Sequence, residues 1–419
     1  MTNTDQKTNA DAVIPSAFAI PDSIGEILAR FDCAGYEAFC VGGCVRDALR
    51  GTEPHDWDLC TSALPDQTAA LFADKPCLDI GIKHGTLTVL WDGIPVEITT
   101  YRTEGAYIGH RTPSSVSFTP SLRQDCLRRD FTVNAMAYHP TIGLRDYFGG
   151  VRDLQSRILR CVGNPGERFD EDALRILRAL RFSSTLDFDI EPETAAAIHE
   201  NASLLAEISG ERILSEFRRM LTGTRAAALL SEYADVIGVF YPPLTGCAGM
   251  EEQLHAAFSR CRTEETRLAA ALCLCGCTDE TAVRKTLSRL PAERVFSDRV
   301  AALTCSAALP PPVTETDLRR RMSAESFGHI TDRLTLHAAL FPEHAAACAN
   351  AAARCREIAA SGAVTRISQL ALNGRDLAAL GFRGREIGEG LQSLLDAVID
   401  GKAENTRPAL FEYAKARKP

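Results

Sequence analysis

The chain is organised around one stretch, which reads Phe39-Cys40-Val41-Gly42-Gly43-Cys44-Val45-Arg46-Asp47-Ala48-Leu49-Arg50-Gly51. An apolar run ends in two glycines and continues into a helical pattern, so the backbone at Gly42 and Gly43 can approach a phosphate chain closely. Arg46 follows one turn into the predicted helix. The stretch therefore predicts half of a nucleotide site, although two glycines before a helix usually form only a tight turn.

Two aspartates follow directly, in His55-Asp56-Trp57-Asp58-Leu59-Cys60-Thr61. If Asp56 to Cys60 form a strand, Asp56 and Asp58 point to the same face and present two carboxylates side by side. Such a pair suits Mg²⁺ that substrate phosphates hold in part. Glu97 alternates with apolar residues in a later predicted strand and is a candidate third carboxylate, but a solvated strand glutamate explains it equally well.

The amino-acid composition limits the classes of protein to which the chain can belong. The 419 residues are 45% hydrophobic and 24% charged, which predicts several domains in series and no membrane span. The polar N-terminus predicts a disordered tail over residues 1–21 and no secretion signal. Many of the 15 cysteines lie inside apolar runs, which favours buried thiols and a cytoplasmic protein.

The net charge of −9 is unfavourable for binding nucleic acid, but the distribution of arginines matters more than the total. One short segment concentrates them, namely Arg152, Arg157, Arg160, Arg168, Arg175, Arg178 and Arg181.

The order of predicted elements indicates an α+β protein. A helix is expected from Asp22 to about Ala34, and a hairpin from Thr86–Trp91 and Ile94–Tyr101 around Asp92-Gly93. A long flexible loop is expected over Ala106–Ser121, and a final strand over Arg128–Tyr138. Helical periodicity dominates from Glu171, so a mixed α/β head should precede a long all-α remainder.

The segment Phe169–Phe182 is predicted to open a helix with acids and continue with arginines. Asp172 and Arg175 would then be neighbours on one face. An acceptor beside donors complements the amino group and adjacent ring nitrogen of cytosine and adenine, and it opposes the polarity of uracil and guanine. The alternative is a surface salt bridge that contributes only a few tenths of a kcal/mol.

Further motifs follow these in a fixed order. They are Gly42-Gly43-x-Val45-Arg46-Asp47, Asp56-x-Asp58, Gly81-Ile82-Lys83-His84-Gly85-Thr86, Glu97-Ile98-Thr99-Thr100-Tyr101-Arg102, Arg128-Arg129-Asp130-Phe131-Thr132-Val133-Asn134-Ala135-Met136-Ala137 and Glu171-Asp172-Ala173-Leu174-Arg175. Ile208-Ser209-Gly210-Glu211-Arg212 and Asn373-Gly374-Arg375-Asp376-Leu377 come later. In order and spacing this series resembles the class II tRNA nucleotidyltransferases, the bacterial CCA-adding type, within the tRNA nucleotidyltransferase/poly(A) polymerase family.

The resemblance implies a polymerase-beta-like catalytic head over residues 22–149 and a helical neck with base recognition over 150–220. It further implies a helical body over 221–365 and a tRNA-binding helical tail over 366–419. The expected activity is addition of C, C and A to tRNA 3′ ends from CTP and ATP, with Mg²⁺ as cofactor and no protein partner.

The resemblance also implies roles for single residues. Asp56 and Asp58 would hold two Mg²⁺ ions, with Glu97 as a possible third catalytic carboxylate. Asp130 would accept a hydrogen bond from the ribose 2′ hydroxyl, and Asp172 with Arg175 would contact the base. The remaining residues expected to bind nucleotide are Gly42, Gly43, Arg46, Arg129, Arg178 and Arg181.

Some alternatives stay open. A poly(A) polymerase shares the head, an enzyme adding only CC or only A is possible, and a catalytically inactive RNA-binding protein fits least well. Gly109 stands where many relatives have an acidic residue in the loop. No His-Asp pair follows Leu268–Leu272, so an accessory phosphohydrolase is not expected. Cys273, Cys275 and Cys277 lack a second cluster, which favours free thiols over a zinc site.

Overall fold

The computed structural model describes residues 18–78, 81, 85–105, 107–109, 112–113 and 115–417. The chain divides into two compact units, Met1–Leu229 and Leu230–Pro419. The finer division into head, neck, body and tail stays a prediction. Residues 1–17 of the predicted N-terminal tail lie outside the described residues, as do Ile82, Lys83 and His84 of the third motif. Phe18 packs on Tyr138, with ring centroids 4.0 Å apart.

The first unit contains a seven-stranded mixed sheet with the strand order β11-β10-β1-β2-β5-β4-β3. β2 and β5 are parallel, and the other neighbouring strands are antiparallel. The strands are β1 (Ala38–Val41), β2 (Leu59–Thr61), β3 (Cys77–Leu78), β4 (Thr86–Trp91), β5 (Ile94–Thr100), β10 (Met136–His139) and β11 (Gly143–Asp146).

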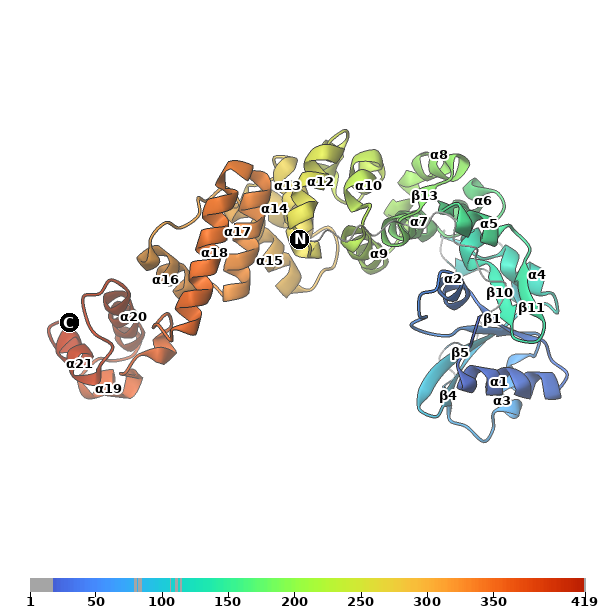
Figure 1. Ribbon diagram of the computed structural model, residues 1–419, viewed down its shortest axis with the longest axis horizontal. Helices are drawn as coiled ribbons and strands as arrows, with labels where there is room; N and C mark the ends of the chain where they lie inside the picture. Colours follow the sequence, from blue (N-terminus) through green and yellow to red (C-terminus); the bar gives the residue numbers. More distant parts are fainter. Residues whose placement is uncertain are drawn as a thin grey trace, which may run out of the picture. The chain divides into compact units, whose positions relative to one another are not determined.

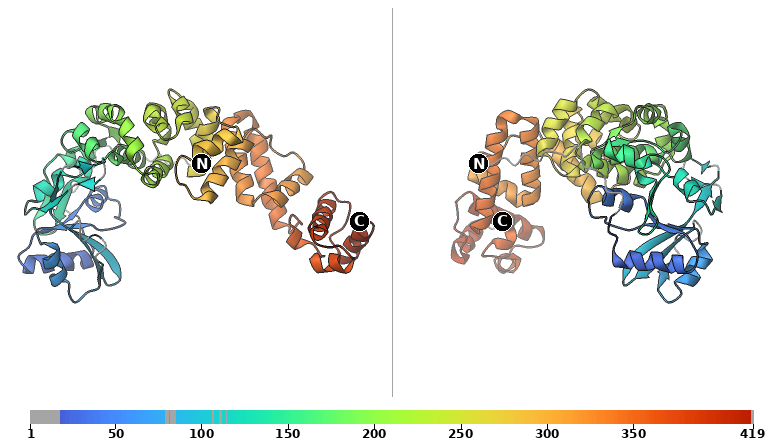
Figure 2. Two further views of the ribbon diagram at one scale, coloured as in Figure 1. Left: turned by 180° about the vertical axis from the view of Figure 1, so that it is seen from behind. Right: turned by 45° about the vertical axis from the view of Figure 1, so that its right-hand side comes forward.

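Three helices belong to this sheet. They are α1 (Asp22–Cys33), α2 (Gly43–Leu49) and α3 (Pro65–Leu71). Helices α1 and α3 lie side by side on one face of the sheet (Figures 1 and 2). Phe72 joins them to the sheet, because its ring contacts Phe31 of α1 and Trp91 of β4 at centroid distances of 5.4 and 6.1 Å.

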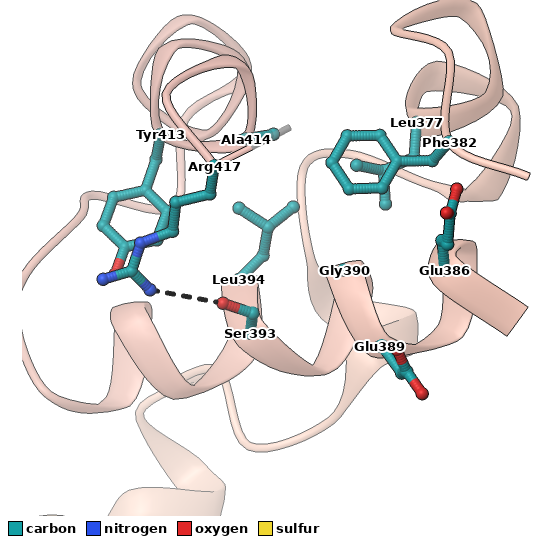
Figure 3. Close-up of a pocket in the computed structure, with 10 residues that line it drawn as sticks. All are labelled: Leu377, Phe382, Glu386, Glu389, Gly390, Ser393, Leu394, Tyr413, Ala414 and Arg417. Atoms are coloured by element: carbon teal, nitrogen blue, oxygen red, sulfur yellow. Dashed lines mark hydrogen bonds between the residues drawn. The ribbon is translucent and has the colours of Figure 1, made fainter. Parts of the chain in front are cut away.

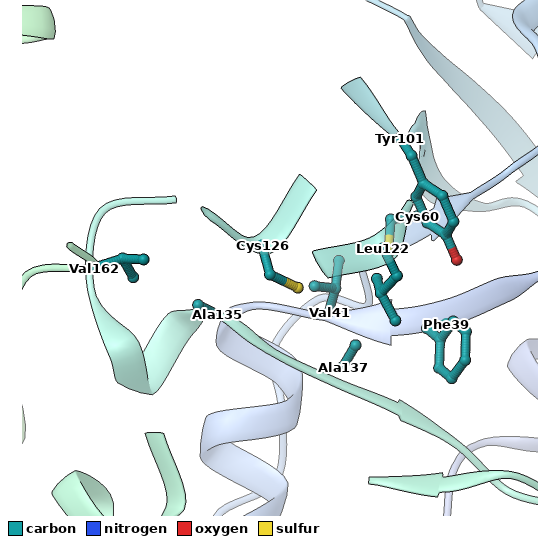
Figure 4. Close-up of a cluster of buried hydrophobic side chains, with 9 residues drawn as sticks. All are labelled: Phe39, Val41, Cys60, Tyr101, Leu122, Cys126, Ala135, Ala137 and Val162. Atoms are coloured by element: carbon teal, nitrogen blue, oxygen red, sulfur yellow. The ribbon is translucent and has the colours of Figure 1, made fainter. Parts of the chain in front are cut away.

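A second apolar cluster lies beside β1 and fixes the strand end from which α2 begins. Phe39 and Val41 of β1 pack with Tyr101 and with Leu122 and Cys126 of α4 (Leu122–Leu127), all of them buried (Figure 4). Apolar contact on this scale makes the position of β1 rigid. The two glycines after β1 are therefore held against a packed core.

The predicted strand over Asp56–Cys60 begins later in the structure, at Leu59. Asp58, the residue before the strand, still pairs with β1 through its backbone, because Val41 N donates to Asp58 O at 2.9 Å. Asp56 and Asp58 precede the strand. The aspartates consequently lie beside the end of β1 and the glycines that follow it.

The expectation of a long loop over Ala106–Ser121 is wrong for the described part of that segment. β6 (Arg102–Glu104) pairs with β9 (Val116–Phe118), and β7 (Tyr107–Ile108) pairs with β8 (Thr112–Pro113). The strands are too short for a period to be recognised, and β9 finds its partner in residues before the segment. Ala106, His110, Arg111 and Ser114 lie outside the described residues.

The predicted final strand over Arg128–Tyr138 is also shorter than expected, and it is not final. The strand begins only at Met136, because Thr132–Asn134 form a 3₁₀ turn before it, and β11 follows it. The strand signal also returns in the helical region, where β12 (Ile158–Leu159) pairs in parallel with β13 (Asp189–Ile190).

The predicted helix through Phe169–Phe182 is in fact two helices, α6 (Pro165–Glu171) and α7 (Leu174–Leu186). Asp172 between them is extended, with φ −137° and ψ 99°. Its Oδ1 accepts a hydrogen bond from Leu174 N at 3.2 Å, which is the way in which aspartate favours the start of a helix over its interior. The other helices here are α5 (Gly150–Gln155), α8 (Pro192–Glu200) and α9 (Gly210–Thr222).

The described part of the second unit contains helices and no strand. The predicted all-α remainder is therefore confirmed from Leu230 onward, whereas β13 interrupts it in the first unit. Helices α17 (Phe327–Leu340) and α18 (Ala345–Ala360) run side by side (Figures 1 and 2). A proline-containing loop over residues 309–313 connects α15 (Arg294–Ser306) to α16 (Glu315–Ala324). The helices are α10 (Ala226–Glu232), which crosses the unit boundary, α11 (Ala234–Gly238), α12 (Glu251–Arg260), α13 (Glu264–Leu274), α14 (Glu280–Leu287), α15 (Arg294–Ser306), α16 (Glu315–Ala324), α17 (Phe327–Leu340), α18 (Ala345–Ala360), α19 (Gly374–Ala379), α20 (Arg385–Ile399) and α21 (Arg407–Lys415).

The last three helices enclose a cavity of 370 Å³, here called the tail pocket (Figure 3). Its lining includes Leu377, Phe382, Leu394 and Ala414, which belong to the apolar core of these helices. Along the described chain, no helix combines the length and apolar character needed to cross a membrane.

Candidate active site

A cavity of 540 Å³ in the first unit brings together all of the predicted site residues except Glu97. We call it the arginine pocket. It is lined by Gly42, Gly43, Arg46, Asp56, Asp58, Arg128, Arg129, Asp130, Asn134, Asp172, Leu174, Arg175, Arg178, Arg181, Phe182 and Arg212. The residues come from the end of β1, helix α2, the segment before β2, the segment after α4, the break between α6 and α7, and helices α7 and α9.

The glycines provide close backbone approach at one wall of this pocket. Gly42 has φ +84°, a conformation that favours glycine, and an added Cβ would stand 3.4 Å from Arg129 Nη1. A Cβ on Gly43 would stand 3.6 Å from Arg46 Nη2. Side chains here would fill the space between the backbone and the arginines, which is the space that a ligand anion needs.

The acidic side of the pocket holds Asp56 and Asp58. The pKa of Asp58 is raised to about 6, first because the surrounding protein displaces water from the carboxylate, and then because Asp56 and Glu97 add negative charge. Glu97 is exposed on β5, as its alternation predicted. Since oxygen ligands and uncompensated negative charge both suit a hard divalent cation, Asp56 and Asp58 can hold one.

The three carboxylates nevertheless do not form a complete metal cage by themselves. Within the described ranges, no three His, Cys, Asp or Glu side chains are grouped closely enough to hold a metal ion. A cation at Asp56 and Asp58 therefore needs further oxygen ligands, which substrate phosphates would supply. All fifteen cysteines lie outside disulfide bonds, including Cys273, Cys275 and Cys277.

The cationic side of the pocket is held by carboxylates. Arg46 donates to Asp47 at 2.9 and 2.8 Å and to Asn134 Oδ1 at 2.6 Å. Arg181 Nε donates to Glu216 of α9 at 2.5 Å. Buried ion pairs of this kind fix the direction of long side chains that would otherwise be mobile.

Asp130 is buried and carries four hydrogen bonds. Its Oδ1 accepts from Phe131 N at 2.8 Å and Asn134 Nδ2 at 3.2 Å, and its Oδ2 accepts from Nε and Nη2 of Arg178 at 2.8 and 2.5 Å. Burial alone would raise the pKa of Asp130, but Arg178 and the hydrogen bonds outweigh it and lower the pKa to about 2. Asp130 is therefore an ionised carboxylate with every lone pair engaged.

Arg129 lies behind the glycines and is tied to a second buried acid. Asp125 Oδ2 accepts from Arg129 at 3.1 Å, while Asp125 Oδ1 accepts from Arg128 at 2.7 Å. Burial would raise the pKa of Asp125, but the two arginines lower it below its ordinary value. This pairing keeps both arginines at the floor of the pocket.

The structure corrects the expected geometry of Asp172 and Arg175. Because a helix break separates them, they are not neighbours on one helical face, and each is bound elsewhere. Asp172 accepts from Arg212 of α9 at 3.0 Å. Arg175 donates to Glu171 at 2.5 Å and to the carbonyl oxygens of Arg168 and Arg128 at 3.0 and 2.9 Å. Both side chains still line the same cavity.

Several residues of the site carried no assigned role in the sequence analysis. They are Phe182, Arg128, Asn134, Arg212, Glu216 and Asp125. Arg212 and Glu216 are four residues apart on α9, a spacing that places both on one face of a helix and could have indicated a shared target. Phe182 directly follows Arg181, but nothing in the sequence distinguishes it from a core phenylalanine.

Two known protein families match parts of this chain, and curated proteins resemble it over most of its length. Residues 38–160 match the family described as the poly A polymerase head domain, and residues 187–235 match the probable RNA and SrmB-binding site of polymerase A. The chain is 37% identical over 414 residues to a CCA-adding enzyme of Streptococcus gordonii, covering 97% of this chain and 99% of that protein. A CCA-adding enzyme of Streptococcus sanguinis is 36% identical, with the same coverage of both chains.

Solved structures give the same result. The crystal structure of the Bacillus stearothermophilus CCA-adding enzyme in complex with CTP aligns with a TM-score of 0.79 and 33% identity, covering 94% of this chain and 97% of that one. The Thermotoga maritima CCA-adding enzyme complexed with tRNA aligns with a TM-score of 0.66 at 20% identity, which shows a shared fold. The resemblance inferred from the motifs is confirmed, and the chain belongs to the CCA-adding enzymes of the class II tRNA nucleotidyltransferase family.

Proposed function

We propose that this chain adds C, C and A in turn to the 3′ end of tRNA, using CTP and ATP without a nucleic-acid template and releasing pyrophosphate. The observation that carries the proposal is the arginine pocket, in which Asp56 and Asp58 share one cavity with seven arginines. A nucleoside triphosphate with its metal ion matches that distribution of charge. The similar enzymes whose names and structures specify CCA addition, CTP and tRNA support the same assignment.

Asp56 and Asp58 would hold Mg²⁺, the divalent ion that prefers carboxylates together with substrate phosphates. When bound, Mg²⁺ lowers the barrier by activating the attacking 3′ hydroxyl and neutralising charge on the phosphates. Loss of water around the carboxylate, and then the negative charge of Asp56 and Glu97, raise the pKa of Asp58, and a bound cation would oppose both effects.

The arginines would orient the triphosphate. Gly42 and Gly43 leave their backbone open to it, while Arg46, Arg178 and Arg181 direct guanidinium groups into the cavity, assisted by Arg129. These groups bring the α-phosphate into line with the 3′ hydroxyl and stabilise the charge that develops on the leaving pyrophosphate.

Asp130 would distinguish ribose from deoxyribose by accepting from the 2′ hydroxyl. Because its four lone-pair sites are already occupied, the hydroxyl would replace one of these hydrogen bonds, and we assign the exchange to Arg178, which gives two of them. That exchange would free a donor of Arg178 for the phosphates at the moment when the ribose is correctly placed.

Asp172 and Arg175 would contact the Watson–Crick edge of cytosine or adenine. In the structure both are engaged, with Arg212 and with Glu171 respectively. Base recognition would therefore exchange intramolecular hydrogen bonds for bonds to the nucleotide, and a base of the wrong polarity would leave these groups unpaired.

The fifteen free thiols support a reducing compartment, and we propose the cytoplasm as the site of action. The helical second unit, with the predicted body and tail, would bind tRNA through shape and phosphate contacts.

The test uses purified protein, Mg²⁺ and labelled tRNA transcripts that end at the discriminator base, at C or at CC. Each transcript is incubated with CTP, ATP, UTP or GTP, singly and in pairs. Growth to CCA followed by arrest is the expected result. Arrest at CC would show a partial enzyme, a long A ladder would show a poly(A) polymerase, and no incorporation would show a protein that only binds RNA.

A further inference from the structure

We propose that Phe182 is a positioning residue of the arginine pocket, whose ring holds the guanidinium groups of Arg46, Arg178 and Arg181 in place for the phosphate chain of the substrate. The inference rests on the proposed function, because it assigns the arginines a triphosphate ligand. It adds a residue to which neither the motifs nor the family comparisons give a role.

The geometry points to one ring that serves three cations. The guanidinium carbon of Arg181 lies 3.7 Å from the centroid of the Phe182 ring, and those of Arg46 and Arg178 lie at 5.3 and 5.4 Å. All three distances are within the range in which a cation is attracted by the ring. Arg46 comes from α2 and the other two from α7, so the ring joins separate parts of the first unit.

The ring itself cannot turn away from these groups. Phe182 is 6% exposed, and Phe131, which is fully buried, contacts it edge to face with centroids 5.8 Å apart at 79°. Edge-to-face packing fixes the orientation of both rings. The cations therefore meet a fixed surface.

An aromatic ring can hold these arginines without neutralising them, which a carboxylate cannot do. Each of these arginines already has one acidic partner, Asp47, Asp130 or Glu216. A further carboxylate would neutralise the charge that the substrate anion needs. The face of a ring attracts the cation through its quadrupole and leaves the full positive charge in place.

Bringing the three guanidinium groups together raises the free energy of the pocket without a ligand, because like charges repel in a partly enclosed site. The ring offsets part of this repulsion and keeps the side chains in the bound arrangement. The substrate then loses less affinity to ordering of side chains. Removing the ring's attraction should weaken binding of the phosphate chain and leave the rate of the bound complex nearly unchanged.

The experiment replaces Phe182 in the full-length chain with phenylalanines that carry one, three and five ring fluorines. Fluorine withdraws electron density from the face of the ring while the shape is nearly kept. Calorimetry then measures the Kd for CTP and for inorganic triphosphate, each with Mg²⁺. We expect the Kd to rise at every step for both probes, by roughly tenfold for the pentafluoro ring.

The matched control is the same series at Phe31, a fully buried residue of α1 whose ring contacts Phe72 and which lies outside the arginine pocket. That series should leave both Kd values unchanged. A flat series at Phe182, with wild-type binding intact, would overturn the role of the ring and leave the proposed function standing. Failure of the wild-type chain to bind either probe would overturn both.

Steady-state kinetics give an independent readout. Phe182→Leu should raise the KM for CTP about tenfold with kcat within about twofold, and Phe182→Tyr should restore the wild-type KM because it keeps the aromatic face. A fall in kcat without a change in KM, or no rescue by Phe182→Tyr in a folded protein, would contradict a positioning role.

Discussion

The arginine pocket of the first unit and the tail pocket of the last three helices differ in what makes up their walls. The arginine pocket is lined by charged side chains that carboxylates hold in place. The tail pocket combines apolar side chains of the local core with Glu386 and Glu389 (Figure 3). Its arginine, Arg417, packs on Tyr413 at 4.5 Å and reaches Ser393 at 3.4 Å.

This difference distinguishes a pocket whose side chains bind a ligand from a pocket whose side chains stabilise the fold by packing. Charges gathered in a cavity reduce stability unless each one is paired, so their presence needs a functional reason. Apolar walls stabilise the fold with or without a ligand, and those of the tail pocket continue the local core. Substitutions in the arginine pocket should therefore affect chemistry more than stability, and those in the tail pocket should do the opposite.

The strongest test of this contrast is Asp58→Asn. We expect kcat to fall on the order of a thousandfold, because a metal carboxylate is lost from the reacting centre. The unfolding midpoint in urea should stay the same or rise slightly, since Asp56 and Glu97 then repel one carboxylate fewer. Glu53→Gln removes an exposed acid outside the cavity and should leave the rate unchanged. Wild-type activity in Asp58→Asn would remove Asp58 from the mechanism.

In the tail pocket, Leu394→Ala should give the converse result. Leu394 is 2% exposed, and truncation of such a residue costs about 3 kcal/mol through lost burial and the cavity it leaves. The rate of nucleotide transfer at saturating substrates should change less than about twofold. Ser393→Ala, which removes a hydroxyl from the same pocket wall, should change the unfolding free energy by less than about 0.5 kcal/mol. A large loss of rate in Leu394→Ala with unchanged stability would show that the tail pocket contacts substrate.

Arg178→Gln tests a residue that should affect both substrate binding and folding stability. Wild-type Asp130, with its pKa lowered from 3.8 to about 2, contributes stability that is complete above about pH 4 and is lost as the pH falls toward 2. Without Arg178 the buried carboxylate loses its charge partner and its pKa should rise. The variant should be about 2 kcal/mol less stable at pH 6, and the difference should shrink at pH 3.

The control for this experiment is Arg178→Lys, which keeps the positive charge and should recover part of the loss at pH 6. Urea unfolding of the three proteins at both pH values provides the comparison. A stability difference that does not depend on pH would mean that packing of Arg178, and not its charge, stabilises Asp130.

The sequence predicts well those parts of the fold that depend on residues close together in the chain. Asp92-Gly93 forms its hairpin with φ +52° and +85°, because both positions need positive φ and glycine and aspartate tolerate it. Gly42 and Arg46 likewise occupy the expected places, since the end of β1 and the start of α2 are set by the local order of apolar residues and glycines.

The errors arise where a partner comes from far along the chain. Asp172 ends one helix and begins the next, and its carboxylate is bound by Arg212, forty residues later. β9 forms because β6 is available to it across the intervening segment. Helical spacing cannot reveal either event. The same limit applies to the arginines, whose positions were predicted but whose acidic partners follow from tertiary packing alone.

The smallest expected effect concerns Asp172, and it tests whether this break in the helix serves recognition. A carboxylate accepts hydrogen bonds only, whereas the amide of Asp172→Asn can turn and also donate. The variant should therefore tolerate the carbonyl of uracil, and the preference for CTP over UTP in kcat/KM should fall by about tenfold. Asparagine is as good as aspartate at the start of a helix, so α7 should remain intact. Asp170→Asn, two residues earlier and outside the cavity, is the control and should keep the wild-type preference.

Arg212→Gln separates the two roles of the carboxylate, because it removes the partner of Asp172 and leaves the acceptor. If Arg212→Gln lowers the preference as much as Asp172→Asn does, recognition depends on holding Asp172 in place. If Asp172→Asn lowers the rate for every nucleotide equally, Asp172 supports the helix break and does not contact the base.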